Sequence, residues 1–139
     1  MPYLSEKTLN GLRSVIRGEG TILRNPFDLG MAIRFPDVLG KALKIIDDDS
    51  NADFIMVNER IDFLLLFNSL NEINTLNDVL IDFNATGHKP LIVISTQASA
   101  DVERIAAEKR LSEAHIPVYP SFQRAAKAIA NVIKYRGNL

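Results

Sequence analysis

The sequence contains no cysteine and no tryptophan, and only 7% of its 139 residues are aromatic. The absence of cysteine excludes disulfides, thiolate catalysis and cysteine-ligated metal sites. Charges nearly cancel, because 16 lysine and arginine residues stand against 17 aspartate and glutamate residues, and no basic cluster indicates a nucleic-acid partner. Apolar residues make up 47% of the chain, which is typical of a globular domain with an aliphatic core.

Long hydrophobic runs and targeting signals are also missing. The longest apolar stretch, residues 61–67, is interrupted by Asp62 and is far shorter than the roughly 20 residues that span a bilayer. The N-terminus lacks the basic and apolar regions of a secretory signal. We therefore expect a soluble, cytoplasmic protein without a membrane partner. Its length suits a single domain that comprises residues 1–139.

Helix-like and strand-like segments alternate along the chain, as in parallel sheets whose strands are joined by crossover helices. Apolar spacing predicts helices that begin after Ser5, at Pro36, near Ala100 and after Ser121. Residues 61–83 also have helical spacing, with a break near Asn68 because polar residues interrupt the apolar face there.

Short apolar runs bounded by turn residues predict strands at residues 54–57, 91–94 and 115–119. The first run is continuously apolar, which predicts a central strand covered on both faces. Pro117 cannot donate a ladder hydrogen bond, so the last strand is expected at a sheet edge. With a further apolar run at residues 21–23, the pattern predicts an α/β fold whose parallel sheet has about four to five strands and helices on both faces.

Ligands of an open parallel sheet bind outside the carboxyl ends of its strands. Three loops fit that position, namely residues 25–30, 58–60 and 95–99. The third loop leads into a helix, so its backbone N–H groups could hold a phosphate or a carboxylate. Its candidate binding residues are Thr96, Gln97 and Ser99. Plain N-capping by such residues is the competing interpretation.

Polar side chains in the other two loops are candidates for ligand binding as well. Asn25 and Asp28 are the candidates in the first loop, and Asn58 and Glu59 are those in the second. Short polar side chains beside a proline also commonly hydrogen-bond their own turn. Turn stabilisation therefore stays open as the alternative function of Asn25 and Asp28.

Neither a catalytic residue nor a metal site is expected. The aspartates at residues 47–49 lack the glycine turn and distal glutamate of a calcium loop, so a solvated turn is predicted there. His88 and His115 have no carboxylate or second histidine at catalytic or metal spacing, and both are predicted to be surface residues. A glycine-rich phosphate loop is also missing, so no cofactor of the domain's own is expected.

Several segments are similar to one protein family, in order. They comprise residues 4–9, 25–29, 42–43, 47–49, 54–57, 89–94 and 116–128. The last segment resembles the family pattern "GIPVY" followed by "PERAARAL" and is the most specific. Over essentially its whole length, the chain resembles the C-terminal flavodoxin-like, succinyl-CoA synthetase-like domain of the NDP-forming acyl-CoA synthetases, which include the ADP-forming acetate–CoA ligases.

The resemblance implies a three-layer flavodoxin-like domain of a larger ligase. The parent enzyme would join an acid to CoA through a phosphohistidine and an acyl phosphate, and it would use CoA, ADP or ATP, and Mg. The implied partners are the CoA-binding and ATP-grasp domains or subunits, together with a small acid, phosphate or CoA. The sequence lacks those domains and the phosphohistidine loop, so we expect an excised or split piece that is inactive alone.

One loop departs from the family and leaves other functions open. Where succinyl-CoA relatives have a glycine pair after the central strand, residues 58–61 contain Glu59, which would repel an anion. Protein lysine acetyltransferases that regulate metabolism carry a similar ligase-like half, and the substituted loop is compatible with that parent. A non-catalytic interaction or scaffold domain is the other alternative.

Overall fold

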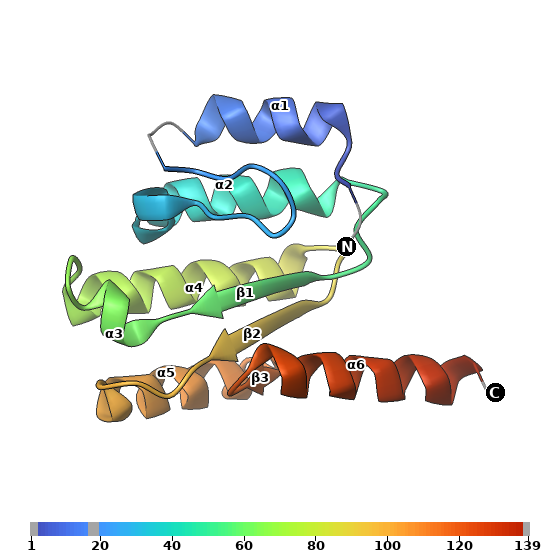
Figure 1. Cartoon of the computed structure of the whole chain (residues 1–139). Coiled ribbons are helices and arrows are strands. Elements are labelled where there is room, and N and C mark those ends of the chain that lie inside the picture. The colour runs from blue at the N-terminus through green and yellow to red at the C-terminus, as the bar shows by residue number, and fades with distance from the viewer. Residues whose placement is uncertain (1–2, 17–19, 138–139) are drawn as a thin grey trace.

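The computed structural model describes residues 3–16 and 20–137, in which helices and strands alternate (Figure 1). The helices are α1 (Glu6–Val15), the short 3-10 helix η1 (Gly30–Arg34), α2 (Pro36–Asp47), α3 (Ile61–Leu64), α4 (Leu70–Thr86), α5 (Asp101–Glu113) and α6 (Phe122–Gly137). The strands are β1 (Ile55–Glu59), β2 (Leu91–Ser95) and β3 (Val118–Tyr119). The chain therefore forms the predicted mixed α/β structure.

The three strands form one parallel sheet in the order β1-β2-β3. The described residues thus form a sheet of three strands, whereas the alternating pattern predicted about four to five. The prediction that β1 is central is wrong, because β2 occupies the centre, whereas the edge position of β3 is confirmed. Residues 21–23 add no strand, since Ile22 pairs only with Asp28 in an isolated antiparallel bridge.

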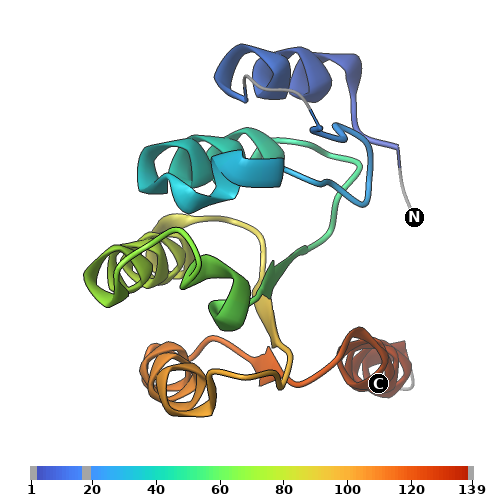
Figure 2. The same cartoon turned by 60° about the vertical axis from the view of Figure 1, so that its left-hand side comes forward.

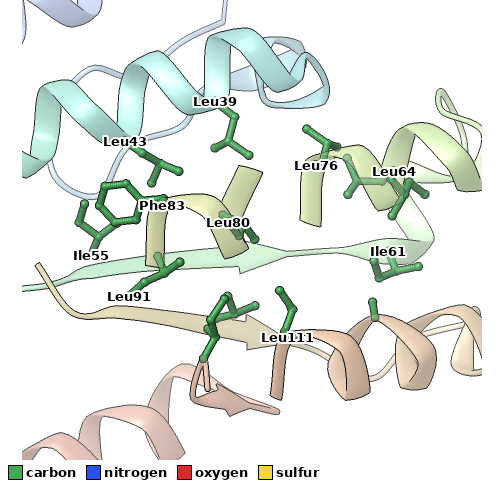
Figure 3. Close-up of a cluster of buried hydrophobic side chains, with 14 residues drawn as sticks. Leu39, Leu43, Ile55, Ile61, Leu64, Leu76, Leu80, Phe83, Leu91 and Leu111 are labelled. Atoms are coloured by element: carbon green, nitrogen blue, oxygen red, sulfur yellow. The ribbon is translucent and has the colours of Figure 1, made fainter. Parts of the chain in front are cut away.

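Helices pack on both faces of the sheet (Figure 2). The main core joins α2, α4 and α5 to one face, and Figure 3 shows Leu43, Leu80 and Leu111 among its members. On the other face, Ala125 of α6 is fully buried in a cluster with Ile92 and Ile94. Successive residues of a strand point to opposite faces, which is why the apolar residues Leu91 to Ile94 of β2 are buried by both sets of helices.

Local capping signals are confirmed where the sequence contains them. The Ser5 side chain accepts the backbone N–H of Thr8 at 3.2 Å and caps α1, as predicted. The predicted break near Asn68 separates α3 from α4. Ser69 then begins α4 with a capping box, in which its hydroxyl and the Glu72 side chain each accept the other residue's backbone N–H. These polar bonds fix where α1 and α4 begin.

Two of the three aspartates at the end of α2, Asp47 and Asp49, are buried and Asp48 is exposed, so the prediction of a solvated turn is wrong for those two. Asp47 is 8% exposed and Asp49 is 2% exposed. Asp47 accepts the backbone N–H groups of His88 and Lys89 at 3.0 and 2.8 Å, in the turn that precedes β2. Asp49 accepts the backbone N–H of Ser5 at 2.8 Å. Long-range backbone donors, which no local pattern reveals, therefore hold these carboxylates at the amino end of the sheet.

The histidines are exposed as predicted, and His88 also has a carboxylate partner. Its Nδ1 lies 2.9 Å from Asp47 Oδ2, although 41 residues separate the two in the sequence. Within residues 3–16 and 20–137, no three acidic or imidazole side chains gather as a metal site. None of the helices in that part of the chain is long and apolar enough to cross a membrane.

Candidate functional site at the carboxyl end of the sheet

The two longer strands end side by side, because Glu59 of β1 and Ser95 of β2 are partners in the parallel register. The loops that follow them lie at the same end of the molecule as η1, at the left of Figure 1. We call this region, comprising residues 30–35, 58–69 and 95–101, the carboxyl end. It is the position at which ligands of parallel sheets bind.

The first predicted loop packs on the helices α1 and α2. Leu23, Phe27 and Leu29 contact the apolar cluster between those helices. Asp28 Oδ1 accepts the backbone N–H of Gly30 at 2.8 Å. The Asp28 carboxylate thus stabilises its own turn, which is the alternative that the sequence left open, and Asn25 is partly buried in the same loop.

The third predicted loop exposes its polar side chains to solvent, namely Thr96, Gln97 and Ser99. Helix α5 begins after Ala100, and no side chain caps it. Its first turn contains Asp101 and Glu103. Carboxylates are favourable at the positive end of a helix, so these two side chains already occupy the electrostatic environment that an anion would use.

The second predicted loop begins inside the sheet, because β1 extends to Glu59 and not only to residue 57 as predicted. Its two polar residues therefore lie in opposite environments. Asn58 is exposed, whereas Glu59 is only 6% exposed, as expected for neighbours on alternate faces of a strand. Burial, and then the negative charge of Glu108, raises the pKa of Glu59 from 4.5 to about 7. Glu59 Oε2 has no hydrogen-bond partner among the described residues.

Two arginines that could pair with Glu59 already have carboxylate partners. They are Arg60, which follows it in the chain, and Arg104 of α5. Arg60 donates to both oxygens of Asp62, at 3.2 and 2.6 Å. Arg104, which lies on α5 with Glu108, donates to Asp101 at 2.9 Å and to Glu108 at 2.5 Å. The ion pairs formed by residues 3–16 and 20–137 thus leave Glu59 without a bonded counter-charge.

Unpartnered polar groups concentrate at the carboxyl end. Five described residues have a buried side-chain nitrogen or oxygen without a hydrogen-bond partner, and four of them, Arg34, Glu59, Asn68 and Ser95, lie there. Each such group costs about 1–3 kcal/mol, and native proteins retain few of them. The sequence identified Glu59 but not Arg34, Asn68 or Ser95, because their lack of partners depends on how distant elements pack.

Aromatic side chains cover the outer part of the carboxyl end. The Arg34 guanidinium lies 4.9 Å from the Phe35 ring centroid and 6.0 Å from that of Phe67. Phe67 in turn packs edge-on against Phe63, with ring centroids 5.4 Å apart. These contacts hold Arg34 over an aromatic surface by cation–π attraction.

A small cavity of about 60 Å³ lies beneath this surface. Three polar residues, Asn58, Glu59 and Arg60, line it together with apolar side chains. The apolar residues are Ile33, Leu39, Val57, Phe63, Leu64, Leu76 and Leu80. A cavity of about 150 Å³ holds a benzene ring, so this one has room for a group of about three heavy atoms. Most of the cavity wall is apolar, and the unpaired carboxyl group of Glu59 lies beside it.

The carboxyl end therefore combines an apolar cavity, a buried carboxyl group and exposed polar loops. This combination can bind a small ligand, with the cavity selecting for size and Glu59 selecting for hydrogen-bond donors. Compared with known proteins, the chain matches no protein-family model, no curated protein and no solved structure.

Proposed function

We propose that the chain is a domain of an NDP-forming acyl-CoA synthetase, an ADP-forming acid–CoA ligase, and that it is inactive alone. The main support is the order of the family-like segments. Residues 54–57, 89–94 and 116–128 supply the three successive parallel strands and the beginning of α6. In this proposal the sheet belongs to a three-layer flavodoxin-like domain.

The carboxyl end would face the other parts of the ligase. Its partners would be the CoA-binding and ATP-grasp domains, and its ligands would come from the acid, phosphate, CoA and ADP or ATP with Mg that the parent uses. The α5 N-terminus would contribute through Thr96, Gln97 and Ser99. Because Asp101 and Glu103 weaken the attraction of that helix end for anions, we expect it to support a neighbouring domain more than to bind phosphate tightly.

A binding experiment on the chain tests this proposal. Phosphate, CoA and ADP are added separately to ¹⁵N-labelled protein, and amide chemical shifts are followed by NMR, with and without CoA-binding and ATP-grasp domains of a ligase. Shifts are expected at residues 96–99, whereas residues 47–49 and 88–89 at the amino end serve as the internal control. No shift at the carboxyl end under either condition would contradict the proposal.

A second candidate function is an interaction domain, and helix α6 is the feature that favours it. Its side chains Phe122, Val132, Ile133 and Tyr135 are 50%, 60%, 64% and 68% exposed. The helix also contains four basic residues and no acidic one. Large apolar side chains left exposed on a basic helix are available for contact with a partner protein. In the NMR experiment, a partner that shifts α6 and leaves residues 96–99 unchanged would favour this function.

A further inference from the structure

We propose that the cavity at the end of β1 binds a small aliphatic ammonium ion, with the ammonium group on Glu59 and the alkyl group among the apolar side chains of the cavity. This site depends on residues of the chain itself and is independent of the ligase function proposed above. It names a chemical class of ligand, not the acid, phosphate or CoA of that function.

The need for a hydrogen-bond donor comes from Glu59. Its side chain is 6% exposed, and its Oε2 is buried without a partner among the described residues. An unsatisfied carboxyl oxygen in a nonpolar environment is costly, and an N–H donor from a ligand would remove that cost. An ammonium group supplies three such donors in a small volume.

The charges around the cavity favour a cation over an anion. Glu59 is the carboxylate without a bonded counter-charge here, because Arg60 and Arg104 pair with other carboxylates, Glu108 among them. Since no group of three metal-ligating side chains exists in the described part of the chain, a divalent metal ion is a poorer fit. An organic cation that needs only one carboxylate fits better.

The walls of the cavity define the rest of the ligand. Val57, Leu64, Leu76 and Leu80 line it, and aliphatic side chains favour an alkyl group over a polar one. With a volume of about 60 Å³, it suits a chain of two or so carbons rather than a ring. Ethylammonium is therefore the natural probe.

NMR titration with ethylammonium chloride at pH 8.5 tests the site, with sodium chloride at matched ionic strength as the reference. The small number of ligand atoms limits the affinity, and we expect a Kd of about 1 mM with shifts centred on residues 57–64. Ethanol and propionate, which have similar size, are expected to bind at least about tenfold more weakly, because they lack the positive charge.

Two variants separate the role of Glu59 from a general charge effect. Glu59→Gln is expected to weaken ethylammonium binding at least about tenfold, since the amide carries no charge. Asp53→Asn removes an exposed carboxylate before the amino end of β1 and is expected to leave the Kd unchanged. Equal weakening by both variants would overturn the site.

The pH dependence of the unmodified chain tests the same point without a substitution. With a Glu59 pKa of about 7, the ionised fraction and the affinity should fall about 30-fold from pH 8.5 to pH 5.5. The other charged groups near Glu59 are Glu108 and Arg104 from α5, Asp62 and Arg60 beside α3, and Arg34 from η1. The contribution of these groups to ethylammonium binding is measured by the pH dependence of the Kd that remains in Glu59→Gln.

Three results would overturn the inference. They are the absence of ethylammonium binding, ethanol binding as tightly as ethylammonium, and propionate binding more tightly than ethylammonium. None of these results bears on the response to phosphate, CoA or ADP, so failure of the ammonium site and failure of the ligase proposal are distinguishable.

Discussion

The two ends of the sheet contain buried carboxyl groups in opposite states. At the amino end, Asp47 and Asp49 accept backbone N–H groups from segments distant in the sequence. At the carboxyl end, Glu59 is equally buried but Oε2 has no partner among the described residues. The carboxylates at the amino end therefore connect distant segments of the fold, whereas the carboxyl group at the other end is available to a ligand.

The pKa values express this difference. Burial alone would raise the pKa of Asp49, but hydrogen bonds from Thr8, Asn51 and Ser5 lower it to about 2. Glu59 lacks such bonds, so burial and the charge of Glu108 raise its pKa to about 7. Burial opposes ionisation at both ends, but the hydrogen bonds of Asp49 make its carboxylate stabilising, whereas the carboxylate of Glu59 destabilises the fold. A functional site is expected to retain unfavourable groups of this kind.

The largest expected effect is a pH-dependent gain in stability for Glu59→Gln. A shift from 4.5 to about 7 corresponds to about 3 kcal/mol at 1.36 kcal/mol per pH unit. Glu59 stabilises the fold fully below pH 4.5, and this contribution is lost as pH rises through 7. The free energy of unfolding of the variant should therefore exceed that of the unmodified chain by about 3 kcal/mol at pH 8.5 and by less than about 0.5 kcal/mol at pH 4.5.

Urea denaturation followed by circular dichroism measures this gain. Asp53→Asn, which changes an exposed carboxylate, should stay within about 0.5 kcal/mol of the unmodified chain at both pH values. If Glu59→Gln shows the same small effect at pH 8.5, Glu59 has a partner after all and the difference between the two ends disappears.

The opposite sign is expected for Asp49→Asn. Because hydrogen bonds lower the pKa of Asp49 from 3.8 to about 2, its ionised form contributes about 2 kcal/mol. This contribution is present above pH 3.8 and is lost as pH falls through 2. The variant should lose about 2 kcal/mol at pH 7, with Asp48→Asn, an exposed neighbour, as control. A loss that persists undiminished at pH 2 would argue against the carboxylate as its cause.

Removal of one hydroxyl at each end gives the smallest expected effect. Ser5 caps α1, so Ser5→Ala should cost about 1 kcal/mol. Ser95 Oγ is buried without a partner among the described residues, so Ser95→Ala removes an unpaired group and should raise the free energy of unfolding by about 1 kcal/mol. Thermal denaturation compares the two, and a greater loss for Ser95→Ala would reverse the assignment of the two ends.

Local sequence signals predicted most of the elements but not the order of the strands. The Ser5 cap, the break near Asn68 and the strand at residues 91–95 follow from capping and from apolar runs. The position of β1 in the sheet could not be predicted, because the same apolar run occurs in edge strands and in central strands. Whether residues 21–23 join the sheet depends on tertiary contacts, and Ile22 pairs with Asp28 instead.

The candidate site was predictable in location but not in composition. The topology of parallel sheets indicated the loop that contains Glu59. The burial of Glu59, and the buried bonds of Asp47 and Asp49, arise between segments far apart in the sequence. The sequence therefore does not distinguish these acidic residues, although those at the amino end of the sheet have hydrogen-bond donors and Glu59 at the carboxyl end has none among the described residues.

The most direct test of this account is the pKa of Glu59 itself. A pH titration of the side-chain carboxyl carbon by ¹³C NMR, with Glu59→Gln used to assign the signal, measures it in the unmodified chain. The account predicts a pKa of about 7, decreasing when ethylammonium is added. A pKa near 4.5, the ordinary value for a glutamate, would show that Glu59 is solvated or paired and would contradict the central claim.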